Sequence, residues 1–383
     1  MTAALSPPQS LLERLPHEWE ELFAGWGQPR YRARQVFAWI HQRGILEPQA
    51  MTDLPGPLRL RLAQEGLAPP LTVVADQVSS DGTRKLLVEM VDGQRVETVL
   101  IPRGSVAERD VYAPPQDDDG DSDDEPDPAA TEAYSQCISS QVGCAMGCAF
   151  CASGIAGLKR QMTAGEIYAQ VLLGRARLEG QRRQSGIVFM GMGEPLHNYP
   201  AVARVLELLR TAEGFGMSLR RVTVSTSGLI PELRQLAEDF GGRVRLAVSV
   251  HASDSASRSR IMPINRRYPL PDLLAALREY PVPGLGRITI EYTLLGGDND
   301  SDGDAVRLSE QLAGLPVKVN LIPVNPVPEA AFPAPSEARV ASFQRILRAR
   351  GLDTFVRRRK GDDIAAACGQ LALHGEKRKV RVL

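Results

Sequence analysis

Three of the five cysteines lie within eight residues, as Cys144, Cys148 and Cys151 of the run CAMGCAFC. An odd number of cysteines with such a tight group favours a metal or redox site in a reducing compartment over a set of disulfides. The group has no fourth cysteine or histidine beside it. Three thiolates can hold three irons of a [4Fe-4S] cluster and leave the fourth iron open to a substrate or cofactor, so the sequence favours an open cluster.

A structural zinc ion is the alternative for the same three thiolates. Zinc is bound tetrahedrally by four ligands, so Cys137, Cys368 or a histidine would have to complete the site from a distance. The spacing of the three cysteines leaves this alternative open.

The elements that would position these residues follow from the pattern of the chain after about Ser135. Short strands rich in β-branched residues alternate with segments of helical period and length, which implies parallel βα units in a barrel or an open sheet. The expected strands are 186–190, 221–225, 244–249, 287–294, 317–322 and 354–358, and the expected helices include 200–213, 231–240, 303–313 and 336–350.

Polar residues follow these strands, one after another. In a βα barrel the carboxyl ends of the strands carry the active site, so we expect the polar residues to form one binding surface. Any one of them alone would more often be a turn former or a helix cap. The residues are Gly193 and Glu194, Ser225 to Ser227, Ser249 with His251, and the run Asn320 to Asn325.

The first hundred residues are expected to form a separate unit. Residues 31–42 combine apolar residues with flanking arginines, which predicts an amphipathic helix with either a solvated or an RNA-contacting basic face. After it, Asp81-Gly82 and Asp92-Gly93 predict the turns of a small hairpin. We expect a helical unit at 1–67, a hairpin at 68–102, an insertion at 103–134 and a core at 135–383.

The insertion is strongly acidic. Residues 117–127, DDDGDSDDEPD, hold eight acids and no base, so the rest of the chain, with 45 basic and 38 acidic residues, carries a net charge of +7. Low hydrophobicity and like-charge repulsion predict that 103–134 is a disordered loop. The basic remainder is compatible with a nucleic-acid partner.

The composition predicts a globular cytoplasmic protein. Of the 383 residues, 43% are hydrophobic, enough to bury a sizeable core. No uninterrupted apolar stretch reaches transmembrane length, and the N-terminus lacks a basic segment followed by an apolar one. We therefore expect neither a membrane anchor nor a secretory signal.

The cysteine run, with Phe150 before its last cysteine, resembles the signature of radical S-adenosylmethionine (SAM) enzymes, and GMGEPLHN (191–198) is similar to their GGE-type motif. The resemblance is strongest to the RlmN/Cfr family of RNA adenine methyltransferases, in particular its RlmN branch, and covers nearly the whole chain except the acidic insertion. It is carried by QCISSQVGC, VTVSTSG, AVSVHA, RIMPINRRYPL, VNLIPVNP and GDDIAAACGQL.

The resemblance implies an α/β fold, a partial (β/α)6 radical SAM barrel with a small N-terminal helical domain and a β-hairpin extension. It implies methylation of C2 in adenine 2503 of 23S rRNA and in adenine 37 of tRNAs, with one [4Fe-4S] cluster and two SAM molecules. One SAM methylates a cysteine, and the other gives a 5'-deoxyadenosyl radical that activates this methyl group. The implied partners are these RNAs and an electron donor such as flavodoxin or ferredoxin, and we expect a monomer.

The resemblance also assigns roles to single residues. Cys368 corresponds to the S-methylcysteine, Cys137 to the resolving cysteine that forms a transient disulfide with it, and Glu97 to the proton acceptor. Without the resemblance, Glu97 would be taken for an outward-facing strand residue. Cys144, Cys148 and Cys151 correspond to the cluster ligands, and the expected SAM contacts are Gly193, Glu194, Ser225, Ser249, Val250, His251 and Asn325.

Two further points follow from the same residues. The bases Arg357 to Lys360 could supply positive potential around Cys368, which would favour its thiolate.

Cfr-type methylation of C8 on the same rRNA adenine remains an alternative, since both branches use the same cysteines. An alternative of another class is a non-catalytic, zinc-binding protein associated with RNA.

Overall fold

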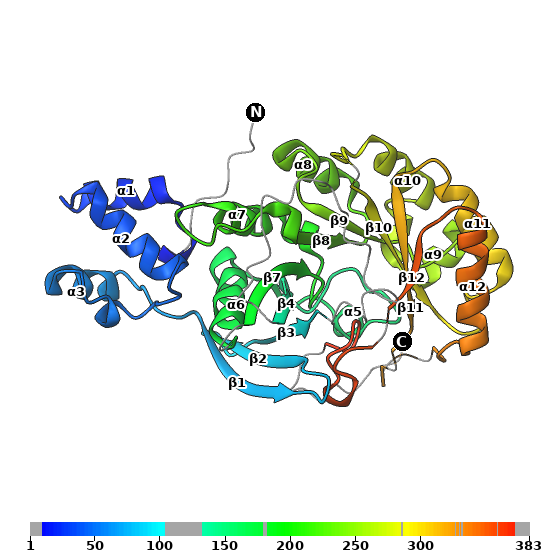
Figure 1. Cartoon of the computed structure of the whole chain (residues 1–383), viewed down its shortest axis with the longest axis horizontal. Helices are drawn as coiled ribbons and strands as arrows, with labels where there is room; N and C mark the ends of the chain where they lie inside the picture. The colour runs from blue at the N-terminus through cyan, green and yellow to red at the C-terminus, as the bar shows by residue number, and fades with distance from the viewer. Residues whose placement is uncertain are drawn as a thin grey trace.

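The computed structural model describes residues 10–103, 132–178, 182–284, 286–325, 327–328, 330, 332–357 and 359–371. The centre of the protein is a ten-stranded sheet with the strand order β1-β2-β3-β4-β7-β8-β9-β10-β11-β12 (Figure 1). The strands β5 (Gln141–Val142) and β6 (Arg160–Gln161) pair with each other and form a second, separate sheet.

Seven neighbouring strands of the large sheet run parallel, and helices fill most of the connections between them. Parallel strands need such crossovers because the chain must return to the same edge before the next strand starts. The strands are β4 (Glu132–Cys137), β7 (Arg182–Phe189), β8 (Val222–Thr226), β9 (Arg245–Ser249), β10 (Ile288–Leu294), β11 (Val317–Pro323) and β12 (Thr354–Val356). The helices are α6 (Ala164–Ala176), α7 (Tyr199–Arg210), α8 (Ile230–Phe240), α9 (Ser255–Ile261), α10 (Leu270–Glu279), α11 (Asp302–Leu312) and α12 (Glu337–Ala349).

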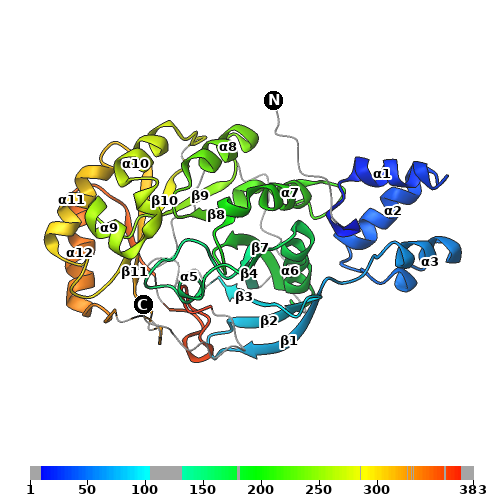
Figure 2. The ribbon, with the colours of Figure 1, turned by 180° about the vertical axis from the view of Figure 1, so that it is seen from behind.

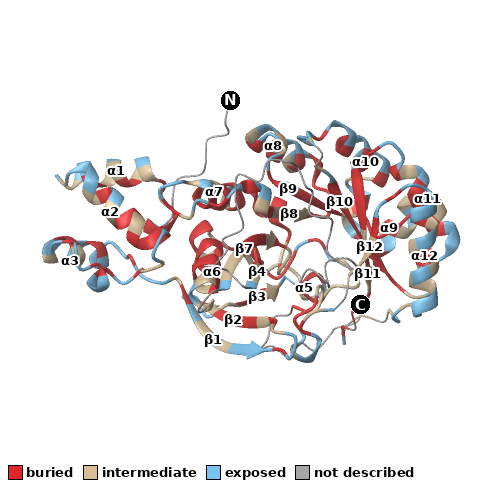
Figure 3. Ribbon diagram, in the orientation of Figure 1, coloured by how far each residue is buried: buried red, intermediate tan, exposed pale blue. Residues whose placement is uncertain are grey.

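Burial follows this layered arrangement. The inner strands are mostly buried, whereas the helices bury one side and expose the other (Figure 3). In α8, for example, Leu233, Leu236 and Phe240 recur at helical spacing and are all at most 1% exposed. Apolar residues at this spacing form one stripe, and packing that stripe on the sheet stabilises the helix.

The expected fold class is confirmed. All six strands predicted after residue 135 are present, and β4 adds a seventh parallel strand that the sequence pattern did not mark. The last strand, expected to span 354–358, ends at Val356, and Arg358 lies outside the described residues. The sheet does not close on itself, because β12 and β1 stand at opposite ends of the strand order, so the barrel is partial.

The predicted hairpin has three antiparallel strands, β1 (Leu71–Val78), β2 (Arg84–Met90) and β3 (Arg95–Pro102). The turns between them contain Gly82 and Gly93, with φ angles of 82° and 78°. Glycine adopts this left-handed conformation without the steric cost that a side chain would bring. Strand β3 also pairs antiparallel with β4, so the hairpin extends the open edge of the barrel.

The acidic insertion begins and ends at adjacent points of the fold. Pro102 on β3 lies opposite Tyr134 on β4, and the Arg103 N–H donates to the Ala133 carbonyl at 2.8 Å. Strand β4 starts at Glu132, so residues 132–134, which were expected to belong to the insertion, are part of this strand. These residues are ordered because they pair with both β3 and β7. The rest of the expected disordered loop, 104–131, lies outside the described residues.

Replacing residues 110–131 with a short Gly/Ser linker is expected to leave iron content and SAM cleavage unchanged within about twofold. The reason is that β3 and β4 pair directly, and a loop that joins paired strands changes the closure entropy only slowly with length. Iron analysis and SAM cleavage by the two proteins, measured side by side, check this. Loss of the cluster in the linker variant would show that the insertion is structural. The linker replacement also removes a polyanion, so the affinity of the variant for non-specific RNA at low salt should be higher than that of the wild type.

Helices α1 (Pro16–Gly25), α2 (Arg30–His41) and α3 (Gly56–Gln64) lie at one end of the molecule, opposite α11 and α12 in both views (Figures 1 and 2). Helix α2 matches the helix expected at 31–42. Several polar contacts tie this unit to the barrel, including one from the Gly165 N–H to the Glu13 carboxylate at 2.8 Å. Arg204 of α7 donates to both Glu18 carboxylate oxygens at 2.7 and 2.8 Å, and buried His41 lies 3.1 Å from the Tyr168 hydroxyl.

Candidate active site

The three clustered cysteines lie on the loop between β5 and the short helix α5 (Ala152–Ala156). Two glycines shape this loop. Gly147 has a φ of 65°, and a side chain at Gly154 would come within 3.0 Å of the Cys148 backbone. Backbone hydrogen bonds reach the sulfurs, from Met146 to Cys144 and from Ser153 and Gly154 to Cys151. N–H groups aimed at sulfur are favourable partners for a thiolate.

All three thiols lie in an environment that opposes a free thiolate. Burial raises the pKa of Cys144 to about 12 and raises the pKa of Cys148 and Cys151 above their ordinary value. The neighbouring Cys151 and Cys144 also raise the pKa of Cys148, so the three sulfurs lie near one another. A metal centre removes this opposition because ligation deprotonates the thiols outright. The residues present therefore fit an iron-sulfur cluster.

A single zinc ion fits the same loop less well. Four ligands around zinc, with Zn–S bonds of about 2.3 Å, would bring the sulfurs to about 3.8 Å from one another. Within the described ranges, no three His, Cys, Asp or Glu side chains lie close enough together to hold one ion.

Glu194 lies beside this loop, in the turn after β7. Its side chain is 4% exposed, and its two carboxylate oxygens accept from the N–H groups of Leu196 (3.2 Å) and Ser227 (2.7 Å). Burial raises the pKa of this carboxyl group. Gly193 precedes it with a φ of 105° and packs so close to Gln141 that a side chain would not fit. The remaining lone pairs of Glu194 suit an ammonium group.

His251 follows β9 and has an unusual backbone conformation, with a φ of 54°. Its Nδ1 accepts a hydrogen bond from the Thr293 N–H at 2.8 Å, so in the neutral ring the proton is on Nε2, which is a donor. Burial, and then the nearby charge of Arg258, lower the pKa of His251 to about 3, so the ring is neutral at physiological pH. The ring packs edge-on against Phe150 of the cysteine run, with centroids 5.0 Å apart.

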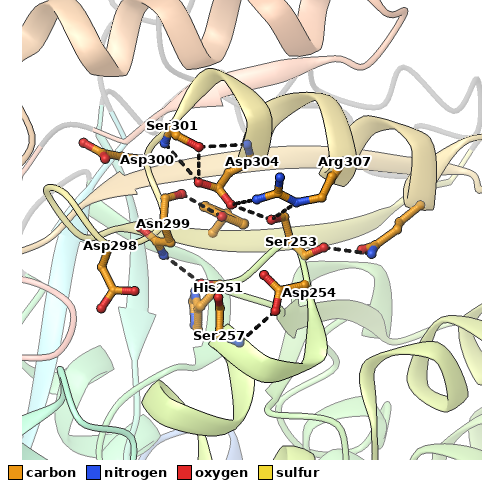
Figure 4. Close-up of polar contacts among 12 residues, drawn as sticks. His251, Ser253, Asp254, Ser257, Asp298, Asn299, Asp300, Ser301, Asp304 and Arg307 are labelled. Carbon is orange, nitrogen blue, oxygen red and sulfur yellow. Dashed lines mark hydrogen bonds and ion pairs between the residues drawn. The ribbon is translucent and has the colours of Figure 1, made fainter.

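The loop after β10 fixes the loop that carries His251 (Figure 4). The Asn299 side-chain amide donates to the carbonyls of His251 and Thr293, both at 2.8 Å, and its oxygen accepts from Leu295. Figure 4 also shows Ser253 donating to Asp304 at 2.6 Å. Sequence reasoning missed Asn299, because nothing in a polar loop marks which residue reaches back to a neighbouring strand.

The other expected SAM contacts lie at the carboxyl ends of neighbouring strands. Ser225 and Ser249 are half-buried on β8 and β9, and the Val250 N–H donates to the Glu291 carbonyl at 3.1 Å. Asn325 follows β11, and its side-chain oxygen is buried without a hydrogen-bond partner. A buried orphan acceptor is costly unless a ligand supplies the donor. The residues expected to form one binding surface thus lie at the ends of β7, β8, β9 and β11.

Cys368 lies on the loop after β12, and this loop is held at several points. The Asn325 amide donates to the Cys368 carbonyl at 2.8 Å. On the side of the cysteine run, the Ala152 N–H donates to the Gly369 carbonyl at 2.9 Å, and the Ser153 hydroxyl donates to the Leu371 carbonyl at 2.7 Å. The loop that carries Cys368 is therefore fixed against the helix that follows the clustered cysteines.

The hairpin holds the other side of the Cys368 loop. Asp81 accepts from the Gly361 N–H at 3.0 Å, and the Lys85 ammonium donates to the Ala365 carbonyl at 3.2 Å. Lys85 also forms an ion pair with Glu97 at 3.0 Å, in which both side chains are at most 5% exposed. Glu97 thus faces inward, toward the loop of Cys368. Sequence reasoning missed Asp81 and Lys85, whose partners are about 280 residues away in the chain.

Cys137, Cys368 and Arg357 form one electrostatic group, and all five cysteines are free thiols. Burial, and then Cys368, raise the pKa of Cys137 to about 12, whereas Arg357 opposes the rise. Cys368 is in turn the largest influence that raises the pKa of Arg357. The expected positive potential beside Cys368 is therefore present at Arg357. Arg359 instead donates to the Val324 carbonyl, at 3.2 Å.

The comparisons with known proteins agree with this arrangement. Residues 138–308 match the Radical SAM superfamily, and residues 10–66 match the ribosomal RNA large subunit methyltransferase N-terminal domain. A protein of Sorangium cellulosum (strain So ce56), named dual-specificity RNA methyltransferase RlmN, is 55% identical over 383 residues, 98% of each chain. A protein of the same name from Anaeromyxobacter dehalogenans (strain 2CP-C) is 44% identical over 371 residues, 95% of this chain and 92% of the relative.

A solved structure has the same fold. The crystal structure of a radical SAM methyltransferase from Sphaerobacter thermophilus superposes with a TM-score of 0.84 at 44% sequence identity, and the match covers 95% of this chain and 99% of that one. Because the match covers 95% of this chain, it includes the N-terminal unit and the hairpin as well as the barrel.

Proposed function

The chain belongs to the RlmN family of dual-specificity RNA methyltransferases, within the radical SAM superfamily, and we propose that it methylates C2 of adenine 2503 in 23S rRNA and of adenine 37 in tRNAs. One observation carries this proposal beyond the family. Cys137 at the end of β4, Cys368 and Arg357 influence one another electrostatically, and the loop that carries Cys368 is fixed to the helix that follows the three clustered cysteines. Adenine C2 is not a nucleophile, so its methylation needs a carbon radical and a sulfur to carry it.

The cofactors are a [4Fe-4S] cluster and SAM. The cluster would be held by Cys144, Cys148 and Cys151. For SAM, Glu194 and Asn325 would supply hydrogen-bond acceptors, and His251 would supply a donor. When bound, the cluster provides the electron that cleaves SAM and so generates a 5'-deoxyadenosyl radical. Gly193, Ser225, Ser249 and Val250 complete the proposed SAM site.

Three side chains carry the later steps. The Cys368 sulfur would first accept a methyl group from one SAM and then lose one hydrogen atom of that group to the 5'-deoxyadenosyl radical from a second SAM. The methylene carbon would bond to adenine C2, and the adduct radical would give up one electron, which the cluster would take back. Glu97 removes the C2 proton, for which its inward position beside Lys85 is suited. The Cys137 thiolate then attacks the Cys368 sulfur, and the bond from that sulfur to the methylene carbon breaks with its electron pair on the carbon. The carbon takes up a proton to become the methyl group, and a Cys137–Cys368 disulfide is left. An external reductant must restore both thiols before the next turnover.

Arg357 assists the sulfur chemistry electrostatically. A thiol with a pKa near 12 is almost fully protonated at neutral pH, so Cys137 needs a partner to react as a thiolate. The guanidinium of Arg357 lowers the pKa of Cys137 and also pairs with Glu291 at 3.9 Å. We propose that Arg357 stabilises whichever of the two sulfurs is ionised.

The RNA would be held mainly through its phosphates, with the target adenine displaced from its stack. The helical unit at 1–67 is the proposed RNA-contacting domain, and the hairpin at 68–102 completes the site. No helix in the described part of the chain is long and apolar enough to cross a membrane. We propose a cytoplasmic monomer that receives electrons from a flavodoxin or ferredoxin.

The test is mass spectrometry of nucleosides from RNA incubated with reconstituted protein, SAM and a reductant. We expect 2-methyladenosine in 23S rRNA and in tRNA, and none with the Cys368→Ala variant, which keeps the cluster ligands. Finding 8-methyladenosine as the main product would replace C2 with C8 as the target carbon. A colourless protein that binds zinc and modifies no RNA would contradict the proposal and favour the non-catalytic alternative.

A further inference from the structure

Arg258 of α9 is a fully buried cation at the centre of the proposed SAM site. None of its surface is exposed. Its guanidinium donates to the carbonyl oxygens of Ser227 (2.7 Å), Ser249 (3.0 Å) and Val250 (3.1 Å), and to the Asn265 side-chain oxygen (3.0 Å). It thus joins the carboxyl ends of β8 and β9.

All four acceptors of Arg258 are neutral. Within the described ranges, no ion pair joins this guanidinium to a carboxylate. Burial accordingly lowers the pKa of Arg258 to about 10. Removing a charge from water is costly unless an opposite charge compensates it, so a buried arginine with only neutral partners indicates that an anion completes the site.

The cysteine run is the neighbour that can supply this anion. Cys148 and Phe150 of this run pack against an apolar cluster that includes Ile261, the last residue of α9. Helix α9 is fixed to the run three residues after Arg258, where the Ala149 N–H donates to the Ile261 carbonyl at 2.9 Å. The distance between guanidinium and cluster site is therefore set by the backbone. Three thiolates bring negative charge to this site, and an added electron makes it more negative.

We propose that Arg258 is the fixed positive charge that compensates the reduced cluster, and that it eases reduction while holding the strand ends that bind SAM. This inference rests on the proposed cluster. A nearby cation in a medium of low polarity stabilises the reduced, more negative state over the oxidised one. Charge and hydrogen bonding around a cluster are known levers on its reduction potential. Removing the guanidinium should therefore make the cluster harder to reduce.

The experiment is a redox titration of reconstituted protein, followed by electron paramagnetic resonance, with wild type, Arg258→Gln and Arg258→Lys compared. For Arg258→Gln, we expect at least a tenfold fall in the ratio of reduced to oxidised cluster at a fixed potential. For one electron this is a shift of about 59 mV to more negative potential. Arg258→Lys keeps the charge but not the full set of hydrogen bonds, and its ratio should stay within about threefold of wild type.

Arg260→Gln is the matched control. This residue lies on the same helix, but its side chain is 59% exposed and pairs with Asp298 at 2.8 Å, so its removal should leave the potential unchanged. Arg258→Met is a second neutral variant, for use if Arg258→Gln does not fold. As a measurement independent of potential, the rise in melting temperature on cluster reconstitution should be smaller in the neutral variants than in wild type, because their cluster lacks its compensating charge.

Several outcomes would overturn the inference. An Arg258→Gln or Arg258→Met cluster with normal iron content and the wild-type potential would contradict it. An equally large shift in Arg258→Lys would show that hydrogen bonds rather than charge are responsible. If the wild-type protein takes up no iron, the proposal of a cluster is wrong. This result is distinct from a failure of the Arg258 inference, because it is seen without any variant.

Discussion

Replacing Cys137 with alanine is expected to leave RNA covalently attached to the protein through Cys368. The variant keeps the sulfur that carries the methyl group, Arg357 beside it and the cluster ligands, so the steps up to bond formation with adenine should proceed. It lacks the neighbouring thiol, whose position is indicated by the mutual electrostatic influence of the two cysteines. Without this thiol the thioether bridge cannot be broken by disulfide formation, and the complex should accumulate toward one RNA per active protein.

A denaturing gel of labelled RNA measures the adduct, and nuclease digestion with peptide mass spectrometry locates the link. Cys368→Ala is the control, because it cannot carry the methyl group and should give no adduct. The double variant should behave like Cys368→Ala. Normal turnover by Cys137→Ala, or an adduct on a residue other than Cys368, would show that the two-cysteine scheme is wrong for this protein.

Replacing Cys148 with alanine is expected to abolish both the visible absorbance of the cluster and all RNA methylation. Three thiolates would hold three irons, and the proposal assigns the two remaining cysteines, Cys137 and Cys368, to the sulfur steps beside Arg357. The Cys144→Ala and Cys151→Ala variants should show the same loss. Absorbance, iron analysis and nucleoside mass spectrometry on the same samples measure it.

Cys368→Ala serves here too as the control, since it should keep wild-type iron content and SAM cleavage while losing methylation. This separates loss of the cluster from loss of the methyl carrier. A Cys148→Ala protein with full iron content and full turnover would be incompatible with the cluster assignment.

The sequence predicted most of the barrel because its strands and helices have strong local patterns. Strand β4 was missed because EAYSQC alternates polar and apolar residues only weakly, and its stability comes from pairing with β3 on one side and β7 on the other. The same pairing explains why residues 132–134, expected in the insertion, belong to β4. Such errors arise where a strand depends on partners that are distant in the sequence.

The site could be predicted only where residues belong to a recognisable local motif. Glu194, His251 and the three clustered cysteines are of this kind, and their neighbourhood in space follows from the order of the strands. Lys85 and Arg258 could not be predicted, because a lysine on a strand and an arginine on a helix are usually exposed. Their burial arises only when the hairpin, the C-terminal loop and the barrel pack together.

The Cys368 loop also sets an order for events on the ribosome that makes this chain. Cys368 is synthesised 217 residues after Cys151, so at translation rates of about 5–20 residues per second roughly 10–40 s separate the two. During this interval the nascent chain has all three proposed cluster ligands, but it lacks the proposed methyl-carrying sulfur. It also lacks the loop segment whose carbonyl oxygens accept hydrogen bonds from Ala152 and Ser153. In the proposed mechanism, an unfinished chain is therefore unable to form the covalent bond to RNA, even if its cluster is already in place.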